Sequence, residues 1–194
     1  MAAKAEYIRA SGGLIESHLE NVGFYEQDLE RAGRLTPPMQ EALQKARDIR
    51  IGHNVLFYLA GALTGVEEPV KQRYSAVSEL IATKPQMFGY APHLHGTDPI
   101  KHPDVTPEEV RDIDYLFAAI VPDAHINFWH PTAHGNAIEE GWAEAQGKPS
   151  LYVVPEGAAL SRLVRGMRNI VDTIVYSDFE EEALPQIDTF LDRL

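Results

Sequence analysis

The stretch HGNAIEEGWAEAQGKP, residues 134–149, is the segment from which the rest of the chain can be placed. Gly135 and Asn136 favour a turn, residues 137–146 are typical of a short helix, and Gly147 is a typical helix stop. The face predicted to be buried consists of Ile138, Gly141, Trp142 and Ala145.

Glu139 falls in the first turn of this predicted helix, where unpaired backbone N–H groups and the helix dipole favour an ionised carboxylate. An ionised and oriented carboxylate is a candidate nucleophile. Glu140 lies about 100° further round the helix and is predicted to be an ordinary solvated residue. The plainer interpretation is that both glutamates only stabilise the helix N-terminus.

Five apolar runs alternate with helical patterns along the chain and are predicted to be strands. They are residues 55–59, 87–92, 124–129, 151–154 and 170–176. Alternating strands and helices predict an α/β fold: a doubly wound, Rossmann- or flavodoxin-like, five-stranded parallel sheet. The predicted α/β domain covers residues 53–194.

Residues 1–52 precede this domain and have helical periodicity. Thr36 is the expected cap of one helix, with Pro37 at its first position. We expect a helical N-terminal extension that serves as a lid, a dimer arm or a packing buttress.

A second helix is predicted to start at Pro107, because Thr106 and Glu109 have capping-box spacing. Asp114 shares its apolar face, which consists of Val110, Ile113, Phe117 and Val121, whereas Asp112 is predicted to point to the opposite side. A carboxylate on an apolar face needs a reason. Asp114 is either functional or paired for structure with a neighbour such as Arg111 or a histidine.

Taken together, the order around Glu139 resembles the signature helix of the nucleoside 2-deoxyribosyltransferase family, which includes the 2'-deoxynucleoside 5'-phosphate N-hydrolases. The shared order is a Gly-led turn, a small residue, an apolar residue, Glu, any residue, Gly, an aromatic residue, Ala, and then Gly-Lys-Pro. The resemblance covers roughly residues 54–176. It implies that Glu139 is the nucleophile and that Asp114 is the second catalytic carboxylate.

The resemblance also implies a substrate site in the loop after the first strand, where Tyr58, Gly61 and Gly65 match in type. The N-hydrolases carry a serine and an arginine in this loop, and here Ala62 and Thr64 replace them. The transferases carry an aspartate six residues before the nucleophile, and here that position is Ala133. Thr132, His134 or Gly135 would then contact the substrate.

The segment LSRLVRG, residues 160–166, resembles the part of the N-hydrolases in which a serine reaches the phosphate of a neighbouring subunit. Ser161 would take that role, and Arg165 belongs to a local cluster with Arg162 and Arg168. A helix is predicted over residues 158–168, with Leu160, Leu163, Val164 and Met167 buried. The implied assembly is a homo-oligomer, a dimer or higher, with a shared active site.

The function that the resemblance implies is hydrolysis of the N-glycosidic bond of a nucleoside 5'-monophosphate through a covalent glycosyl-enzyme. Deoxyribosyl transfer and a non-catalytic nucleotide sensor are the alternatives. The base, and ribose against deoxyribose, stay open. No cofactor is expected.

Composition limits the partners. The 194 residues carry a net charge of −12, which argues against a nucleic-acid polymer as the partner. With no cysteine, thiol chemistry is excluded. His93 and His95 have a plausible ligand spacing, but no metal motif accompanies them and no metal is expected. No apolar run suits a signal peptide or a membrane span, so a cytoplasmic protein without membrane contact is expected.

Overall fold

Five parallel strands form one sheet in the order β2-β1-β3-β4-β5. The computed structural model describes residues 15–96, 98, 100–131 and 134–194. The strands are β1 (Val55–Ala60), β2 (Met87–Tyr90), β3 (Ala124–Phe128), β4 (Ser150–Pro155) and β5 (Ile170–Tyr176). All five predicted strands are therefore confirmed, and the strand order is that of a flavodoxin-like α/β fold.

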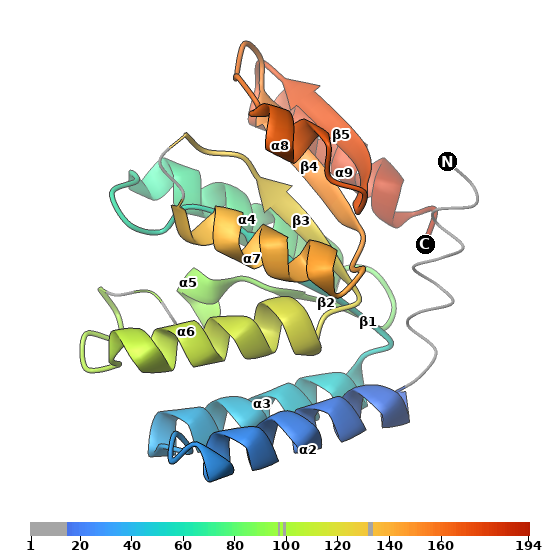
Figure 1. Ribbon diagram of the computed structural model, residues 1–194. Coiled ribbons are helices and arrows are strands. Elements are labelled where there is room, and N and C mark those ends of the chain that lie inside the picture. The colour runs from blue at the N-terminus through green and yellow to red at the C-terminus, as the bar shows by residue number, and fades with distance from the viewer. Residues whose placement is uncertain (1–14, 97, 99, 132–133) are drawn as a thin grey trace.

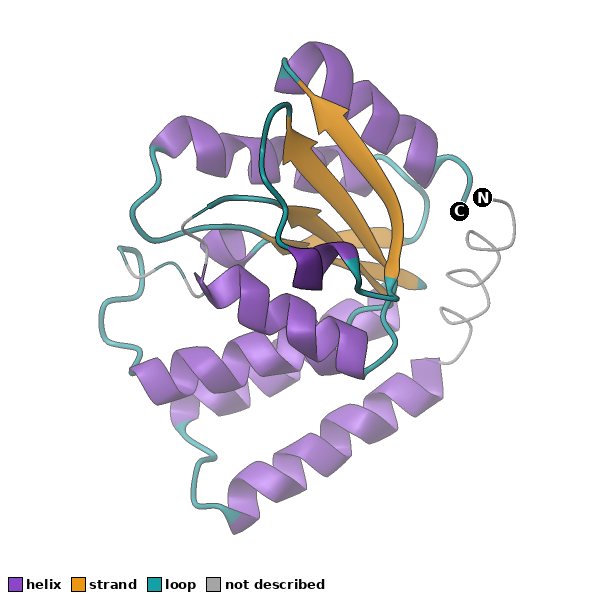
Figure 2. Cartoon of the chain, turned by 45° about the horizontal axis from the view of Figure 1, so that its top comes forward, coloured by secondary structure: helices purple, strands orange, loops and turns teal. Residues whose placement is uncertain are grey.

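Helices cover both faces of the sheet (Figures 1 and 2). One face packs against α4 (Glu68–Ala82), the π-helical turn η2 (Phe179–Ala183) and α9 (Leu184–Leu191). The other face packs against α6 (Pro107–Tyr115), its π-helical continuation η1 (Leu116–Ile120) and α7 (His134–Ala145). The described residues include no helix that is long and apolar enough to cross a membrane.

The alternation along each strand decides which side chains reach the face under α7. In β1, Phe57 and Leu59 belong to the core beneath α4 and α9, whereas Leu56 and Tyr58 belong to the core on the opposite face. In β3, Asn127 lies on the α7 side and bonds to that helix. Polar side chains of two strands are thus collected under one helix.

The N-terminal helices α2 (Ile15–Arg31) and α3 (Pro37–Gly52) form an outer layer over α6 and η1 (Figure 1). Arg50 is fully buried and bonds to both carboxylate oxygens of Asp123, at 2.5 and 3.0 Å. His18 reaches the same carboxylate at 3.1 Å. Of the three roles expected for this extension, the contacts fit a packing buttress.

The helix starts predicted at Pro37 and Pro107 are confirmed. Thr106 caps α6 with both halves of the capping box, at 2.9 and 3.3 Å. Thr36 occupies the N-cap position of α3 and Pro37 begins that helix, but the Thr36 side chain makes no capping hydrogen bond. Pro92, predicted to end the second strand, instead begins the short helix α5 (Pro92–His95).

The helix predicted over residues 158–168 is wrong in length. The structure has only α8 (Arg162–Arg165), capped by Ser161, whose hydroxyl accepts the Val164 N–H at 3.2 Å. The four apolar side chains predicted to be buried are half-buried or exposed, and Leu163 is 83% exposed. A single helical turn has too little length to bury an apolar stripe.

Candidate active site

Glu139 is joined to strand β1 by Tyr58, whose hydroxyl donates a 2.8 Å hydrogen bond to Glu139 Oε1. Tyr58 is fully buried and Glu139 is 8% exposed. The other carboxylate oxygen, Oε2, makes no hydrogen bond within the part of the chain that the structure describes. The contact lies near the carboxyl ends of β1 and β3, where the strand order reverses and where ligands of open α/β sheets bind.

The position of Glu139 differs from the sequence prediction. Helix α7 begins at His134 rather than at Ala137, so Glu139 lies in the second turn, beyond the unpaired N–H groups. Burial, the negative charge of Asp114 and that of Glu140 raise the pKa of Glu139 to about 8, although the bond from Tyr58 acts in the opposite direction. The expectation of a carboxylate kept ionised by the helix N-terminus is therefore wrong.

Asp114 is half-buried on α6 and acts electrostatically on Glu139 and Tyr58, whose pKa values it raises. The structure thus brings the two predicted catalytic carboxylates into one neighbourhood. The negative charge of Asp114 therefore favours the protonated form of Glu139, because neighbouring like charges resist joint ionisation.

Asp112 does point away from Asp114, but it is not solvated. It is 2% exposed and accepts bonds from Arg34 at 2.5 Å and Arg111 at 2.6 Å. Tyr25 of α2 also contacts it. The N-terminal layer covers the face that helical phase alone would leave open, and Arg111 pairs with Asp112.

Glu140 is also buried, at 2% exposure, and this corrects the prediction of a solvated residue. Its carboxylate accepts hydrogen bonds from Asn127 at 2.7 Å, Ser150 at 2.6 Å and Asn169 at 2.8 Å. The predicted buried face of α7 is consequently wrong: Ile138 is 55% exposed, because the strands present polar partners to the helix. Glu140 anchors α7 beside the candidate nucleophile.

Tyr90 is a member of this site that the sequence interpretation missed. It pairs with Tyr58 in the register of β1 and β2, and the two rings stack at 6.0 Å. Asp114 and Glu139 both contribute to raising its pKa, after burial. The available signal was an aromatic residue at the carboxyl end of the strand neighbouring β1.

The loop after β1 holds the predicted substrate residues Gly61, Thr64 and Gly65. A Cβ atom on Gly61 would lie 2.4 Å from the ring of Tyr74, so packing alone requires glycine there. Gly65 has a φ of +71°, a left-handed conformation that favours glycine. Thr64 is exposed beside it. Their predicted contact with substrate stays a prediction.

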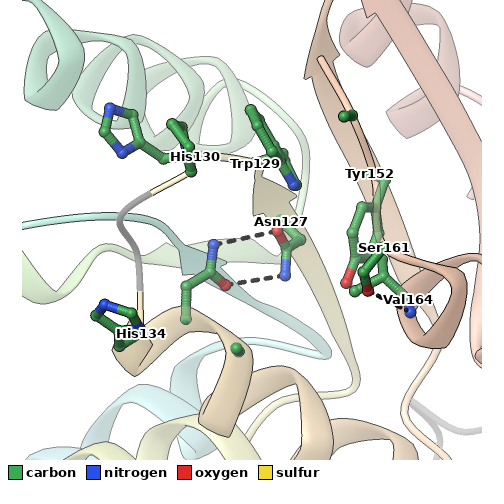
Figure 3. Close-up of a pocket in the computed structure, with 11 residues that line it drawn as sticks. Asn127, Trp129, His130, His134, Tyr152, Ser161 and Val164 are labelled. Atoms are coloured by element: carbon green, nitrogen blue, oxygen red, sulfur yellow. Dashed lines mark hydrogen bonds between the residues drawn. The ribbon is translucent and has the colours of Figure 1, made fainter.

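A pocket of about 280 Å³ lies between the N-terminus of α7 and α8. Figure 3 shows Asn127 at its centre, His134 on one side and Ser161 on the other. The structure therefore brings His134 and Ser161 of one chain to one pocket, with Trp129 and His130. Gly135 is exposed next to His134 in α7, Arg165 is exposed on α8 outside the pocket lining, and Thr132 lies outside the described residues.

Two of the histidines make hydrogen-bond contacts within the fold. His93 contacts Ser75 at 2.8 Å, and His125 bonds to the carbonyl of Ala118 at 2.7 Å. Burial lowers the pKa of both rings. Within the described ranges, no three His, Asp or Glu side chains gather as a metal ion would need.

No family model matches the chain, and no curated protein matches it. A solved structure that resembles it is a CMP N-glycosidase from Clostridium botulinum, with 22% identity and a TM-score of 0.53, covering 70% of this chain and 98% of that chain. Another is a conserved protein from Enterococcus faecalis V583, with 16% identity and a TM-score of 0.49 over the same shares. At such identity the likeness to the glycosidase shows the fold alone: an all-parallel, five-stranded Rossmann-like sheet flanked by helices.

Proposed function

We propose that this protein hydrolyses the N-glycosidic bond of a nucleoside 5'-monophosphate, with Glu139 as nucleophile. The observation that carries the proposal is the buried bond from Tyr58 to Glu139 at the switch point of the sheet, with Asp114 in electrostatic contact. A fixed carboxylate with one oxygen bonded and one unbonded suits attack on a sugar carbon. The resemblance of the fold to a CMP N-glycosidase supports the same substrate class.

In the first step Glu139 Oε2 forms a bond to C1' while the C1'–N bond breaks. The electron pair of that bond goes to the base nitrogen, and the base takes up a proton. In the second step a water oxygen attacks C1' and loses a proton, and the C1'–Oε2 bond breaks. The products are the free base and the sugar phosphate, and the glutamate carboxylate is regenerated.

A buried carboxylate is suited to the first step. Loss of hydration and the charge of Asp114 destabilise the Glu139 anion before substrate binds. An oxocarbenium-like sugar brings positive charge next to that anion, so the attraction is greatest in the transition state. Asp114 supplies the second function, either orienting a sugar hydroxyl or assisting proton transfer to the base.

Because the chain as a whole is acidic, a 5'-phosphate must be bound by a local group of hydrogen-bond donors. Ser161 and His134 line one pocket, and Arg162 and Arg165 on α8 form no ion pair with any described residue. Charge-assisted hydrogen bonds from such groups are about twice as strong as neutral ones. We propose that α8 grips the phosphate bound beside Glu139 of a second subunit in a homo-oligomer.

The test is to incubate the protein with ribo- and deoxyribonucleoside monophosphates and to follow free base by chromatography, with and without a second base. Base released without an acceptor supports hydrolysis. Base exchange only in the presence of an acceptor identifies a transferase. Tight binding without product identifies a sensor and contradicts the proposal.

A further inference from the structure

The hydroxyl of Tyr90 is buried and unsatisfied. Tyr90 is 2% exposed, and its phenolic oxygen makes no hydrogen bond to any part of the chain that the structure describes. Buried phenols normally find a partner, because a donor removed from water without one is costly. Tyr58, its neighbour in the sheet register, has such a partner in Glu139. One of two adjacent phenols is therefore bonded and the other is not.

Packing holds the Tyr90 ring in place. The ring stacks on Phe117 at 3.9 Å with an interplanar angle of 9°, and on Tyr58 at 6.0 Å with an angle of 14°. His95 stacks at 5.0 Å. A ring held between aromatic neighbours cannot turn its hydroxyl to solvent without breaking these contacts. The donor is thus preorganised for something that the described protein atoms do not supply.

The two catalytic carboxylates lie close to this donor. Asp114 precedes Phe117 by three residues, so the two side chains share one face of the helix that packs on Tyr90. The pKa of Tyr90 is raised by burial and then by Asp114 and Glu139. The hydroxyl therefore keeps its proton and acts as a donor beside two acceptors.

We propose that Tyr90 is a substrate-binding residue whose hydroxyl donates to a hydroxyl oxygen of the sugar, while that same sugar hydroxyl donates to Asp114. The inference rests on the proposed function. A hydroxyl group accepts and donates at one oxygen, which matches a phenol and a carboxylate placed together. A phosphate only accepts hydrogen bonds, and two carboxylates would repel it. Attack by Glu139 on C1' places the departing base on the far side of the sugar.

The decisive variant is Tyr90→Phe, which removes one oxygen and keeps the stacked ring. Since the hydroxyl is unsatisfied in the free protein, the variant should unfold at a higher urea concentration than wild type. Its kcat/KM on the best nucleotide should nevertheless fall roughly 10- to 100-fold, as expected for a lost bond to substrate. A purely structural hydroxyl would lower stability and leave kcat/KM unchanged.

Tyr25→Phe is the matched control, because Tyr25 also has a hydroxyl in contact with an aspartate, Asp112, away from the site. This variant should lose stability and keep its kcat/KM. Nucleotides that lack the 2'-hydroxyl or the 3'-hydroxyl identify the bonded group. With the correct one removed, wild type and Tyr90→Phe should react at the same rate.

Two failures are distinguishable. In the first, wild type releases base, and Tyr90→Phe either has the same kcat/KM as wild type on every nucleotide or has a kcat/KM reduced by the same factor on all of them. The sugar contact is then wrong and the proposed function stands. If wild type neither releases base nor binds nucleotide in calorimetry, the proposed function fails and takes this inference with it. A stabilised Tyr90→Phe protein with an impaired reaction, restored to parity on one deoxygenated nucleotide, supports the contact.

Discussion

The hydroxyl of Tyr58 lies 2.8 Å from Oε1 of Glu139 and connects strand β1 to helix α7 across 81 residues of sequence. This bond stabilises the anion, yet the pKa of Glu139 is still raised to about 8, since burial and the charge of Asp114 act more strongly. The surroundings of Glu139 thus disfavour its ionised form, which is the form that the proposed role as nucleophile requires. This conflict has consequences for both rate and stability.

The rate consequence is an acidic limb in the pH profile. Attack needs the ionised carboxylate, which predominates in the free protein only above about pH 8. We expect kcat/KM to rise about tenfold per pH unit at lower pH and to level off above pH 8. Initial rates between pH 5 and 9.5 would test this. A flat profile from pH 6 upward would contradict a nucleophile with a raised pKa.

The stability consequence is a gain in the Glu139→Gln variant. In the unfolded chain the Glu139 carboxyl has a pKa of about 4.3. In the folded protein its pKa is about 8, so Glu139 keeps its proton up to that pH. Stability from this group is therefore fully present below pH 4 and falls as pH rises toward 8, by roughly 5 kcal/mol at most. A glutamine at position 139 cannot ionise, so the variant does not lose this stability as the pH rises.

We therefore expect the free energy of unfolding of Glu139→Gln, measured with urea, to exceed that of wild type by roughly 1–4 kcal/mol at pH 8. At pH 4.5 the two proteins should be equally stable. Turnover should be abolished, because an amide of the same shape is not a nucleophile. Glu20→Gln, at an exposed position on α2, is the control and should change neither property. Equal stabilities of Glu139→Gln and wild type at every pH would remove the case for a destabilised anion.

The sheet could be predicted from the sequence because each strand is a short, largely apolar run, and the three central strands β1, β3 and β4 are buried on both faces. Phe57 and Tyr58 illustrate this, because their large rings are buried in the cores on opposite faces of β1. The start of α6 could be predicted because the capping box is a local interaction between Thr106 and Glu109. Such signals lie within a few residues of one another.

The side chains around the site could not be predicted in the same way, because their burial depends on distant segments. Glu140 is buried only because Asn127, Ser150 and Asn169 arrive from three other parts of the chain. Asp112 is buried because Tyr25 of α2 and Arg34 of the loop that follows α2 cover it. Helical phase predicts the direction in which a side chain points, but it does not predict which distant segments pack against that side chain.

The two aspartates of α6 should separate function from stability. Asp114→Asn should reduce kcat/KM on the order of a hundredfold and should shift the acidic limb of the pH profile to lower pH, because one of the charges that raise the pKa of Glu139 is removed. Asp112→Asn should leave kcat/KM nearly unchanged. It should lower the free energy of unfolding by roughly 1.5–3 kcal/mol, because Arg34 and Arg111 lose a charged partner.

Kinetics and urea unfolding on both variants provide this comparison. Similar losses of turnover in the two variants would mean that Asp114 acts through the helix rather than on the substrate.

Glu140 should be important for folding rather than for chemistry. Glu140→Ala leaves buried donors of Asn127, Ser150 and Asn169 without their shared acceptor, and each such loss costs about 1–3 kcal/mol. We expect the largest stability loss among single substitutions on α7. Glu144→Ala, which removes one bond to the Arg168 N–H, is the matched control and should cost less. Chemical denaturation of the two variants compares them directly.

The shared site can be tested by mixing inactive proteins. If Ser161 and Arg165 grip the phosphate held beside a partner's Glu139, Glu139→Gln mixed with the double variant Ser161→Ala, Arg165→Ala forms mixed dimers in which one site is intact. About a quarter of wild-type activity should return after random subunit exchange at equal concentration. Glu139→Gln mixed with Asp114→Asn is the control, since both residues lie in one chain's site and neither mixed-dimer site is whole.

Ser161 and His134 line the same pocket of a single chain, so a site completed within one chain is the competing arrangement. In that arrangement every mixed dimer carries one defect in each site, and neither mixture recovers activity. Light scattering separates the arrangements further, because a protein that is monomeric while fully active has no partner to supply α8. Recovery in the first mixture together with none in the control can arise only when Glu139 of one subunit works beside α8 of the other.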